Sequence, residues 1–407
     1  MKYIILIGDG MSDNPIERLG GKTTLQAACT PMMDRIAMGG EFGLFSSVPE
    51  GYPPGSDVAN LSILGYAPAK YYTGRAPLEA ASIGVELAKG DVAFRCNLVT
   101  IGGGEEGRVM ADYSAGHIST EEAAKIIATL DKEFKADGVR FYTGTSYRHL
   151  MVWADGKSNY KMTPPHDISD QVIAPEHLPT GDGVEMIMHL MERSVELLKD
   201  HPVNEARRAA GKNTADCIWL WGQGRAPRMP TFKDSYNISG GIISAVDLMK
   251  GIGIFAGLEV IEVEGVTGYI DTNYKGKAEA ALDSLDRNDF VCVHVEAPDE
   301  AGHQGKLEDK LQAIEDFDAK IVAPVFNGAV DKFGADGFKL MVITDHPTPV
   351  ELKTHTSDAV PFAIYGGGEP SGLTFSEVEA RKSSNKKTEP GEFIKEFLCV
   401  EQDASPL

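Results

Sequence analysis

The stretch Phe338-Lys339-Leu340-Met341-Val342-Ile343-Thr344-Asp345-His346-Pro347 shows the pattern on which the fold is organised. Its first part, Phe338–Ile343, has the apolar character of a strand that is buried on both faces of a parallel sheet. Asp345 and His346 then place an anionic oxygen and a neutral nitrogen at the carboxyl end of that strand, where open α/β sheets bind ligands. Because such a sequence also suits an ordinary turn, its function depends on what other strands bring to the same edge.

Two further apolar runs end in the same kinds of side chain. Tyr3–Ile7 leads to Asp9, and a glycine on each side of Asp9 allows a sharp turn and the close approach of a ligand. Phe290–Val295 leads to Asp299 and His303, whose i, i+4 spacing puts both side chains on one face of a helical turn. Parallel strands would bring all of these side chains to one edge of a sheet.

A serine stands where a phosphate would bind. Pro53-Pro54-Gly55 predicts a tight turn, and residues 57–64 can run as a helix, so Ser56 would open that helix. Unpaired amide hydrogens and the positive end of the helix dipole favour a phosphate or a developing oxyanion there. A serine at this position is also a common N-cap. Since the sequence has no Gly-x-Ser-x-Gly elbow, activation by a metal has to be considered.

Composition indicates a globular protein with room for an enzyme. For 407 residues two domains are expected, one of which can interrupt the other. The net charge of −21 argues against a nucleic-acid surface but suits cationic partners. Tyr3–Ile7 is too short for a signal peptide or a membrane span, and the five scattered cysteines indicate free thiols in a reducing compartment. We therefore expect a cytoplasmic protein that binds neither nucleic acid nor membranes.

The pattern changes to α+β in the middle of the chain and then returns to α/β. Strands over 92–101 and 108–112 around a glycine-rich turn predict an antiparallel hairpin. After residue 239, helices are expected over 244–249, 276–285 and 307–322, and a strand over 259–262. Loops of the middle segment carry Arg148, His166, Asp167, Arg225 and Arg228. Loop arginines are usually solvated, but on a rigid loop they suit bidentate recognition of phosphate or carboxylate.

Seven oxygen and nitrogen donors are predicted to converge at the sheet edge: Asp9, Ser56, Asp299, His303, Asp345, His346 and His355. Three carboxylates packed together without cations would raise one another's pKa, and divalent metal ions relieve that cost. The donors divide into one site with Asp9, Asp345, His346 and Ser56, and another with Asp299, His303 and His355. Such sets suit Mn²⁺ or Zn²⁺ better than Mg²⁺. Two ions about 4 Å apart can deprotonate a serine and clamp a phosphoryl group, which would make Ser56 a nucleophile.

Five motifs follow one another in a distinctive order: Asp9-Gly10, Gly55-Ser56-Asp57-Val58-Ala59-Asn60, Asp299-x-x-x-His303, Thr344-Asp345-His346 and His355-Thr356-Ser357. In this order they resemble the alkaline phosphatase superfamily, and closely its cofactor-independent (2,3-bisphosphoglycerate-independent) phosphoglycerate mutases of the archaeal type. The resemblance covers essentially the whole chain. It implies an alkaline-phosphatase-like α/β core, with a mostly parallel sheet flanked by helices, and an inserted α+β lid domain.

The resemblance also implies a division of labour. A discontinuous metal-binding catalytic domain would cover residues 1–88 and 235–407, and a substrate-binding domain would cover 89–234. Ser56 would take the phosphoryl group from 3-phosphoglycerate and return it to the other hydroxyl of glycerate, with two divalent metal ions, Mn²⁺ foremost, as cofactors. The implied contacts to this small phosphorylated substrate are Arg148, His166, Asp167, Arg225, Arg228 and Lys277.

Other functions fit parts of the same sequence. The resemblance also allows a homoserine kinase, because sequences of this same branch are implicated as such kinases, which would need a nucleoside triphosphate donor. A phosphatase or phosphopentomutase could use the same metal core. If the Asp and His residues merely cap turns, the chain would instead be an acidic metal-storage or interaction protein. Nothing in the sequence indicates an oligomeric state.

Overall fold

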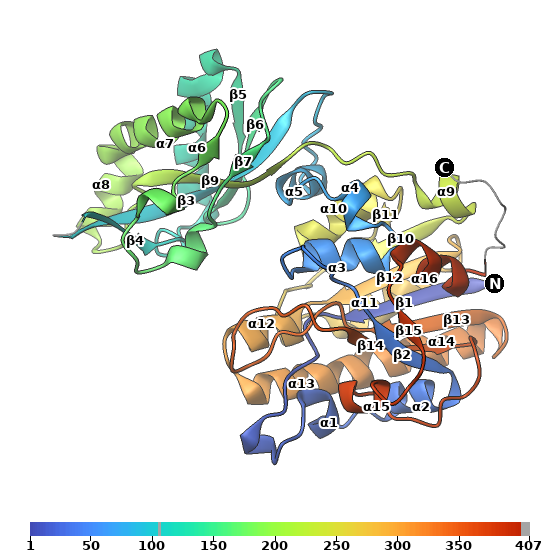
Figure 1. The fold of residues 1–407 in the computed structure, drawn as a ribbon. Helices are drawn as coiled ribbons and strands as arrows, with labels where there is room; N and C mark the ends of the chain where they lie inside the picture. The colour runs from blue at the N-terminus through green and yellow to red at the C-terminus, as the bar shows by residue number, and fades with distance from the viewer. Residues whose placement is uncertain (105–106, 400–407) are drawn as a thin grey trace. The chain divides into compact units, whose positions relative to one another are not determined.

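The structure is a computed structural model that describes residues 1–104 and 107–399. The chain divides into two compact units. Unit 1 combines residues 1–72 and 228–407, of which 400–407 lie outside the described part, and unit 2 consists of residues 73–227. Each unit has its own sheet and its own buried apolar core (Figure 1). Among the described residues, no helix has the length and apolar character that crossing a membrane requires.

Unit 1 is built on an eight-stranded sheet with the order β11-β10-β12-β1-β13-β14-β2-β15. The strands are β1 (Lys2–Gly8), β2 (Glu41–Phe45), β10 (Gly240–Ile243), β11 (Glu259–Val260), β12 (Phe290–Val295), β13 (Phe338–Ile343), β14 (Val360–Tyr365) and β15 (Lys386–Lys387). The strands from β11 to β13 in this order run parallel, and β15 pairs parallel to β2. Only β14 is antiparallel to both of its neighbours. The predicted α/β class with a mostly parallel sheet is therefore confirmed.

Helices cover both faces of this sheet (Figure 1). The larger helices are α2 (Pro31–Gly39), α3 (Ser56–Ile63), α10 (Asp247–Phe255), α11 (Tyr274–Ser284), α13 (Leu307–Phe317), α14 (Ala323–Phe333) and α16 (Pro390–Phe397). Alternate residues of β1, such as Ile4 and Leu6, share one core with α2, α11, α13 and α14. On the opposite face Phe393 of α16 stacks on Phe45 of β2 with ring centroids 4.5 Å apart. This double cover explains why the central strands are continuously apolar.

Shorter helices connect these elements in unit 1. They are α1 (Thr24–Ala27), α4 (Pro68–Tyr71), α9 (Phe232–Tyr236), α12 (Ala297–His303), α15 (Glu377–Ala380) and the 3₁₀ turn η1 (Glu17–Leu19). The helix expected over 307–322 ends at Phe317, and a π-helical turn, η5 (Asp318–Val322), joins it to α14. Pro324 lies in the first turn of α14 and has no amide hydrogen, so regular α-helical bonding cannot continue through it.

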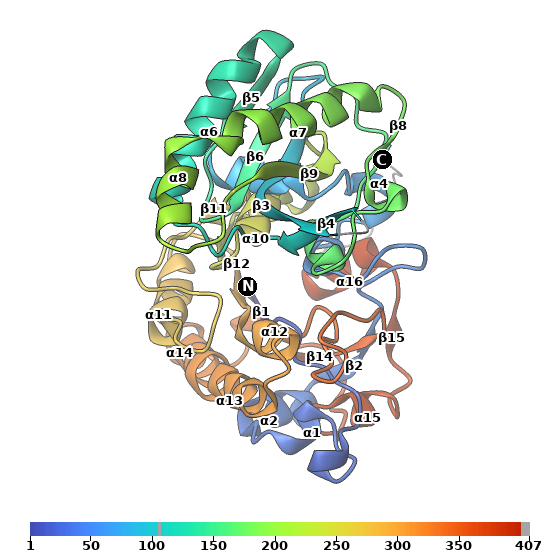
Figure 2. The ribbon, with the colours of Figure 1, turned by 90° about the vertical axis from the view of Figure 1, so that its left-hand side faces the viewer.

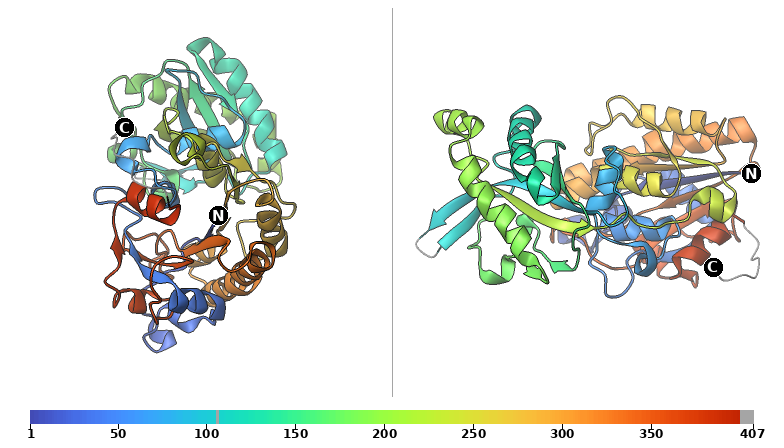
Figure 3. Two further views of the ribbon diagram at one scale, coloured as in Figure 1. Left: turned by 90° about the vertical axis from the view of Figure 1, so that its right-hand side faces the viewer. Right: turned by 90° about the horizontal axis from the view of Figure 1, so that it is seen from above.

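Unit 2 has a five-stranded antiparallel sheet in which the long central strand β3 pairs with β4, β6 and β9, and β5 pairs with β6. The strands of this sheet are β3 (Val92–Gly104), β4 (Gly107–Asp112), β5 (Val139–Tyr142), β6 (Arg148–Trp153) and β9 (Cys217–Gly224). A separate two-stranded sheet is formed by β7 (Tyr160–Lys161) and β8 (Thr180–Gly181). The helices of unit 2 are α5 (Ala76–Ser82), α6 (Thr120–Phe134), α7 (Val184–Lys199), α8 (Pro202–Ala209) and the 3₁₀ turns η2 (Lys135–Asp137), η3 (Pro165–Ile168) and η4 (Pro175–His177). Helices α6 and α7 share one apolar core with β3 and can be followed in Figures 2 and 3. The predicted hairpin is confirmed, although β3 continues through the glycines where the turn was expected.

The division between the units differs from the predicted one. The sequence suggested boundaries after residues 88 and 234, whereas the two units separate after residues 72 and 227. Helix α5 accounts for the first shift, because its Ala76 and Ala80 pack against Ala93 of β3 and Leu150 of β6.

Two elements of unit 1 have bounds that differ from the predicted ones. The helix predicted over 244–249 is α10, which begins at Asp247, and the strand predicted over 259–262 is the shorter β11.

A buried histidine is expected to make the stability of unit 2 depend on pH. His149 of β6 is 3% exposed, and burial lowers its pKa from 6.5 to about 3. Below pH 6.5 the imidazole of His149 therefore binds a proton in the unfolded chain but not in the folded chain, which lowers the free energy of unfolding by about 1.4 kcal/mol per pH unit. Urea unfolding followed by tryptophan fluorescence should give a free energy about 2 kcal/mol lower at pH 5 than at pH 7. All three tryptophans lie in unit 2, so the signal reports this unit.

His149→Asn provides the matched control for this prediction. The Nδ1 atom of His149 accepts a hydrogen bond from the amide of Gly144 at 3.1 Å, and an asparagine oxygen can take over that role without titrating. The variant should lose most of the pH dependence between pH 7 and pH 5. An equally steep dependence in the variant would assign the effect to other groups.

Candidate metal centre

The carboxyl ends of three neighbouring parallel strands bring the predicted donors together in unit 1. Asp9 follows β1, and Asp345 follows β13, whose Ile343 pairs with Ile7 of β1. On the other side of β1, strand β12 leads into α12, the helix that carries Asp299 and His303. The expectation that strand ends would gather these side chains at one edge of the sheet therefore agrees with the geometry.

One group of donors surrounds Asp9. Ligand atoms of Asp9, Asp345 and His346 all lie within 4.8 Å of one another. Ser56, the first residue of α3, has its Oγ 3.0 Å from His346 Nε2 and 3.5 Å from Asp9 Oδ2. This arrangement sets a hydroxyl at a helix N-terminus directly beside the buried carboxylate of Asp9 and the imidazole of His346.

A second group lies next to the first. Ligand atoms of Asp299, His346 and His355 also lie within 4.8 Å of one another. His303 Nε2 is 2.9 Å from His355 Nε2 and 3.3 Å from Asp299 Oδ2. His346 belongs to both groups, so the seven donors form one continuous cluster, whereas the sequence assigned His346 to the Asp9 group alone.

The electrostatics of the cluster favour a cation. Burial, together with the charges of Asp345 and Asp299, raises the pKa of Asp9 well above its usual value. Burial acts in the same direction on Asp299, but hydrogen bonds from His303 and His355 hold its pKa well below the usual range. Asp9 Oδ1 is buried and accepts no hydrogen bond from any described residue. A buried anionic oxygen without a donor is costly, and a divalent cation would remove that cost.

Side chains outside the predicted set orient the donors. Asn60 Nδ2 donates to Asp345 Oδ2 at 2.9 Å, and Thr348 Oγ1 donates to Asp299 Oδ1 at 2.5 Å. His294 Nε2 lies 2.9 Å from Asp9 Oδ2. None of the three was assigned a role from the sequence. For His294 a signal was present, because it is the one polar residue in the otherwise apolar run Phe290–Val295.

A buried lysine braces the loop that carries Thr348. Lys310 of α13 is fully buried, and its Nζ donates to Asp13 Oδ2 at 2.9 Å and to the carbonyl oxygens of Ser12 and Thr348. Lys310→Met should therefore leave a buried carboxylate without its partner and lower the free energy of unfolding by about 3–5 kcal/mol. Urea unfolding followed by circular dichroism measures this change.

Lys306→Met is the matched control for this brace. Lys306 is exposed and lies 3.8 Å from Asp309, an ion pair of a kind that contributes little to stability. A loss in Lys306→Met as large as that in Lys310→Met would mean that the buried contacts are not the cause.

The predicted substrate contacts are distributed over both units. Arg148, His166, Asp167 and Arg225 lie in unit 2, and Arg228 and Lys277 lie in unit 1. Arg225 donates to the carbonyl oxygens of Gly90 and Gly156 and so holds two loops of unit 2 together. Lys277 is fully buried, its Nζ donates to the carbonyl oxygen of His294 at 3.0 Å, and burial lowers its pKa to about 8.

The other predicted contacts are more accessible. Arg148 is exposed at the start of β6 with its guanidinium 5.4 Å from the centre of the Tyr147 ring. His166 and Asp167 form an exposed pair with Nε2 and Oδ1 3.6 Å apart. The ring of His166 meets Trp221 edge to face at 5.2 Å. Arg228 is exposed.

Unit 2 also contains an arginine pair that the sequence analysis did not assign to a site. Arg75 Nε and Arg95 Nε each donate to one oxygen of Glu79, both at 2.9 Å. The guanidinium of Arg95 lies 4.1 Å from the centre of the Trp221 ring. Burial lowers the pKa of Arg95 to about 10, which still leaves the side chain cationic at neutral pH. The two guanidinium groups therefore both contact the carboxylate of Glu79.

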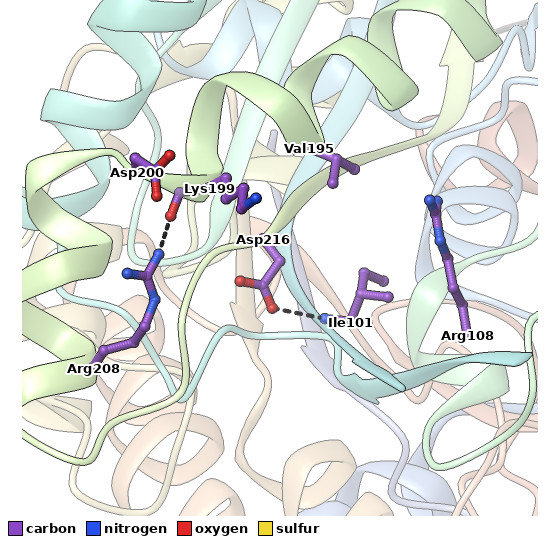
Figure 4. Close-up of a pocket in the computed structure, with 7 residues that line it drawn as sticks. All are labelled: Ile101, Arg108, Val195, Lys199, Asp200, Arg208 and Asp216. Atoms are coloured by element: carbon purple, nitrogen blue, oxygen red, sulfur yellow. Dashed lines mark hydrogen bonds between the residues drawn. The ribbon is translucent and has the colours of Figure 1, made fainter. Parts of the chain in front are cut away.

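A separate cavity of about 410 Å³ lies elsewhere in unit 2 (Figure 4). Its charged lining residues are Arg108, Lys199, Asp200, Arg208 and Asp216. Asp216 Oδ2 accepts from the amide of Ile101 at 3.1 Å, and Arg208 donates to the carbonyl oxygen of Lys199. The lining has charges of both signs and includes none of the predicted site residues, so it does not select a ligand.

Comparisons with known proteins give a consistent result. A family model described as 2,3-bisphosphoglycerate-independent phosphoglycerate mutase matches residues 37–204. The chain is 54% identical over 400 residues to a probable mutase of this kind from Geobacter sulfurreducens, with 98% of this chain and 99% of the relative covered. It is 56% identical over 388 residues to the 2,3-bisphosphoglycerate-independent phosphoglycerate mutase of Methanosarcina acetivorans, covering 95% of this chain and 96% of the relative.

Solved structures with the same fold are also found. A Pyrococcus horikoshii protein of 28% identity aligns with a TM-score of 0.81 and covers 100% of this chain and 99% of its own. The cofactor-independent phosphoglycerate mutase of Thermoplasma acidophilum aligns with 25% identity and a TM-score of 0.65, covering 98% of this chain and 100% of its own. The likeness therefore extends through both units.

Proposed function

The chain belongs to the family of 2,3-bisphosphoglycerate-independent phosphoglycerate mutases, and on that premise we propose a mechanism. Ser56 takes the phosphoryl group from 3-phosphoglycerate, and the phosphoserine returns it to the other hydroxyl of the bound glycerate, giving 2-phosphoglycerate. The observation that carries the proposal is the position of Ser56 Oγ, 3.0 Å from His346 Nε2 and 3.5 Å from Asp9 Oδ2 at the start of α3.

The donors fit two divalent cations, with Mn²⁺ preferred over Zn²⁺ and Mg²⁺ because carboxylate and imidazole ligands are mixed. The residues that would hold them are Asp9, Ser56, Asp345 and His346 on one side and Asp299, His303 and His355 on the other. The orphaned Asp9 Oδ1 and the three buried carboxylates support this fit. Bound cations would lower the pKa of the serine hydroxyl and neutralise charge on the transferring phosphoryl group.

The residues of the chain contribute orientation and charge. At the N-terminus of α3, amide hydrogens and the helix dipole favour the phosphoryl oxygens next to Ser56. Asn60, one turn further along α3, holds Asp345 in place, so the nucleophile and a donor are positioned by the same helix. Pre-positioning of this kind accounts for much of the rate gain in phosphoryl transfer.

We assign substrate binding to unit 2 and catalysis to unit 1. Arg148, together with the Arg75 and Arg95 pair, offers guanidinium groups for the carboxylate and phosphate of the substrate. His166 and Asp167 are further candidates, because they are exposed on the same unit. We retain Arg225, Arg228 and Lys277 as candidates as well, although Arg225 and Lys277 donate hydrogen bonds to backbone carbonyl oxygens.

An enolase-coupled assay tests the proposal. Purified protein with 3-phosphoglycerate and Mn²⁺ should turn over without added 2,3-bisphosphoglycerate. Turnover of ATP and homoserine with no interconversion of phosphoglycerates would instead indicate a kinase, and release of inorganic phosphate would indicate a phosphatase. On this function we place the enzyme in glycolysis and in the cytoplasm.

A further inference from the structure

A buried hydrogen-bond relay runs from Ser244 through His294 to Asp9. Three neighbouring strands supply its members, because Ser244 follows β10, His294 lies in β12 and Asp9 follows β1. His294 Nε2 is 2.9 Å from Asp9 Oδ2, and His294 Nδ1 is 3.2 Å from Ser244 Oγ. All three residues are 2% exposed or less, so solvent hardly competes for these contacts.

The contacts of both ring nitrogens indicate the tautomer of His294. Ser244 Oγ accepts a hydrogen bond from the amide of Val246 at 3.0 Å, which favours donation of its own proton to His294 Nδ1, 3.2 Å away. An ionised carboxylate, the form that binds a cation, can only accept hydrogen bonds, so the contact with Asp9 Oδ2 calls for a proton on His294 Nε2. A neutral ring that accepts at Nδ1 carries its proton on Nε2, and Nε2 therefore donates to Asp9 Oδ2.

This donation divides the two oxygens of Asp9 between two tasks. Oδ2 is held by the ring of His294 at 2.9 Å and is also 3.5 Å from Ser56 Oγ, whereas Oδ1 accepts no hydrogen bond from the described residues. Oδ1 lies 3.6 Å from His346 Nε2, on the side of the donor cluster. With one oxygen anchored, the carboxylate cannot rotate about its side-chain bonds without losing a buried hydrogen bond.

We propose that His294, held at Nδ1 by Ser244, is a positioning residue that holds Asp9 so that Oδ1 faces the cation site. The inference rests on the proposed metal-dependent function and deepens it. Groups that orient a metal ligand from behind in this way typically change metal affinity by about 10- to 100-fold when they are removed.

The test is a calorimetric titration of metal-stripped, full-length protein with Mn²⁺. The wild type should bind two ions. His294→Leu fills the buried space with an apolar side chain but has no hydrogen-bond donor, so it should bind one of the ions about 10- to 100-fold more weakly. His294→Gln should recover most of this loss, because its amide nitrogen can still donate to Asp9 Oδ2. Ser244→Ala, which disturbs packing least, should weaken the same ion by about 10-fold.

The outcomes separate the relay from the proposed function. Wild-type affinity for both ions in folded Ser244→Ala and His294→Leu would overturn the relay, and so would a His294→Gln variant that binds as weakly as His294→Leu. If His294→Leu does not fold, Ser244→Ala and His294→Gln decide alone. A wild type that binds no Mn²⁺ would overturn the metal-dependent function itself.

Discussion

Replacing Ser56 with alanine is expected to abolish mutase activity, with a loss on the order of 10⁴-fold or more in kcat, as found for catalytic nucleophiles elsewhere. The reason is that the transferring phosphoryl group then has no hydroxyl to receive it beside Asp9 and His346. Folding should be preserved, because Ser56 opens α3 without acting as a side-chain cap. The enolase-coupled assay measures the loss, and mass spectrometry should find a phosphorylated Ser56 peptide in the wild type only.

Ser62→Ala is the matched control on the same helix. Ser62 is buried, and its Oγ donates to the carbonyl oxygen of Val58 at 3.1 Å, a bond within α3 that has no part in the donor cluster. Its removal should leave kcat near that of the wild type. Full activity in Ser56→Ala, or an equal loss in Ser62→Ala, would contradict the assignment of Ser56 as the nucleophile.

The sequence could group the candidate donors because the sheet determines where strand ends lie. Continuous apolar runs indicate strands buried on both faces, and β1, β12 and β13 among them run parallel, so their carboxyl ends meet at one edge. Asp9, Asp299 and Asp345 could therefore be grouped without a structure, and they do lie together. Periodicity alone could not show that His346 would be shared between both groups, because that depends on the direction of its ring.

The residues that orient the donors could not be predicted in the same way. Asn60 and Thr348 act through single hydrogen bonds whose partners are far away in sequence, and neither residue differs in type from an ordinary helix or loop residue. The start of unit 2 was missed for a related reason. Ala76 and Ala80 read as a generic helix face until the strand that they cover is known.

Removing divalent metal ions is expected to stop turnover completely and to destabilise unit 1. Without cations, Asp9, Asp299 and Asp345 are left as neighbouring buried carboxylates. Burial and the repulsion between their charges are unfavourable, which is why the pKa of Asp9 is raised. Each bound ion stabilises the folded state by about 4 kcal/mol when its concentration is 1,000 times Kd. The Tm at pH 8 should therefore fall after chelation and recover with Mn²⁺, together with activity.

The difference in Tm between metal-loaded and metal-free protein should shrink as the pH falls. Protonation of carboxylate and imidazole ligands weakens metal binding. In the metal-free protein the pKa of Asp9 is higher in the folded chain than in the unfolded chain, so ionised Asp9 lowers the stability of the folded state at high pH. This destabilisation decreases as the pH falls below the folded pKa, because Asp9 then becomes protonated. Both effects have the same sign, so scanning calorimetry at pH 8 and pH 5.5 should show a smaller difference in Tm at the lower pH.

Asp345→Asn should remove the increase in Tm on adding Mn²⁺, whereas the exposed control Asp358→Asn should keep it. A gap that is constant with pH, or a full Mn²⁺ response in Asp345→Asn, would mean that the ions bind elsewhere.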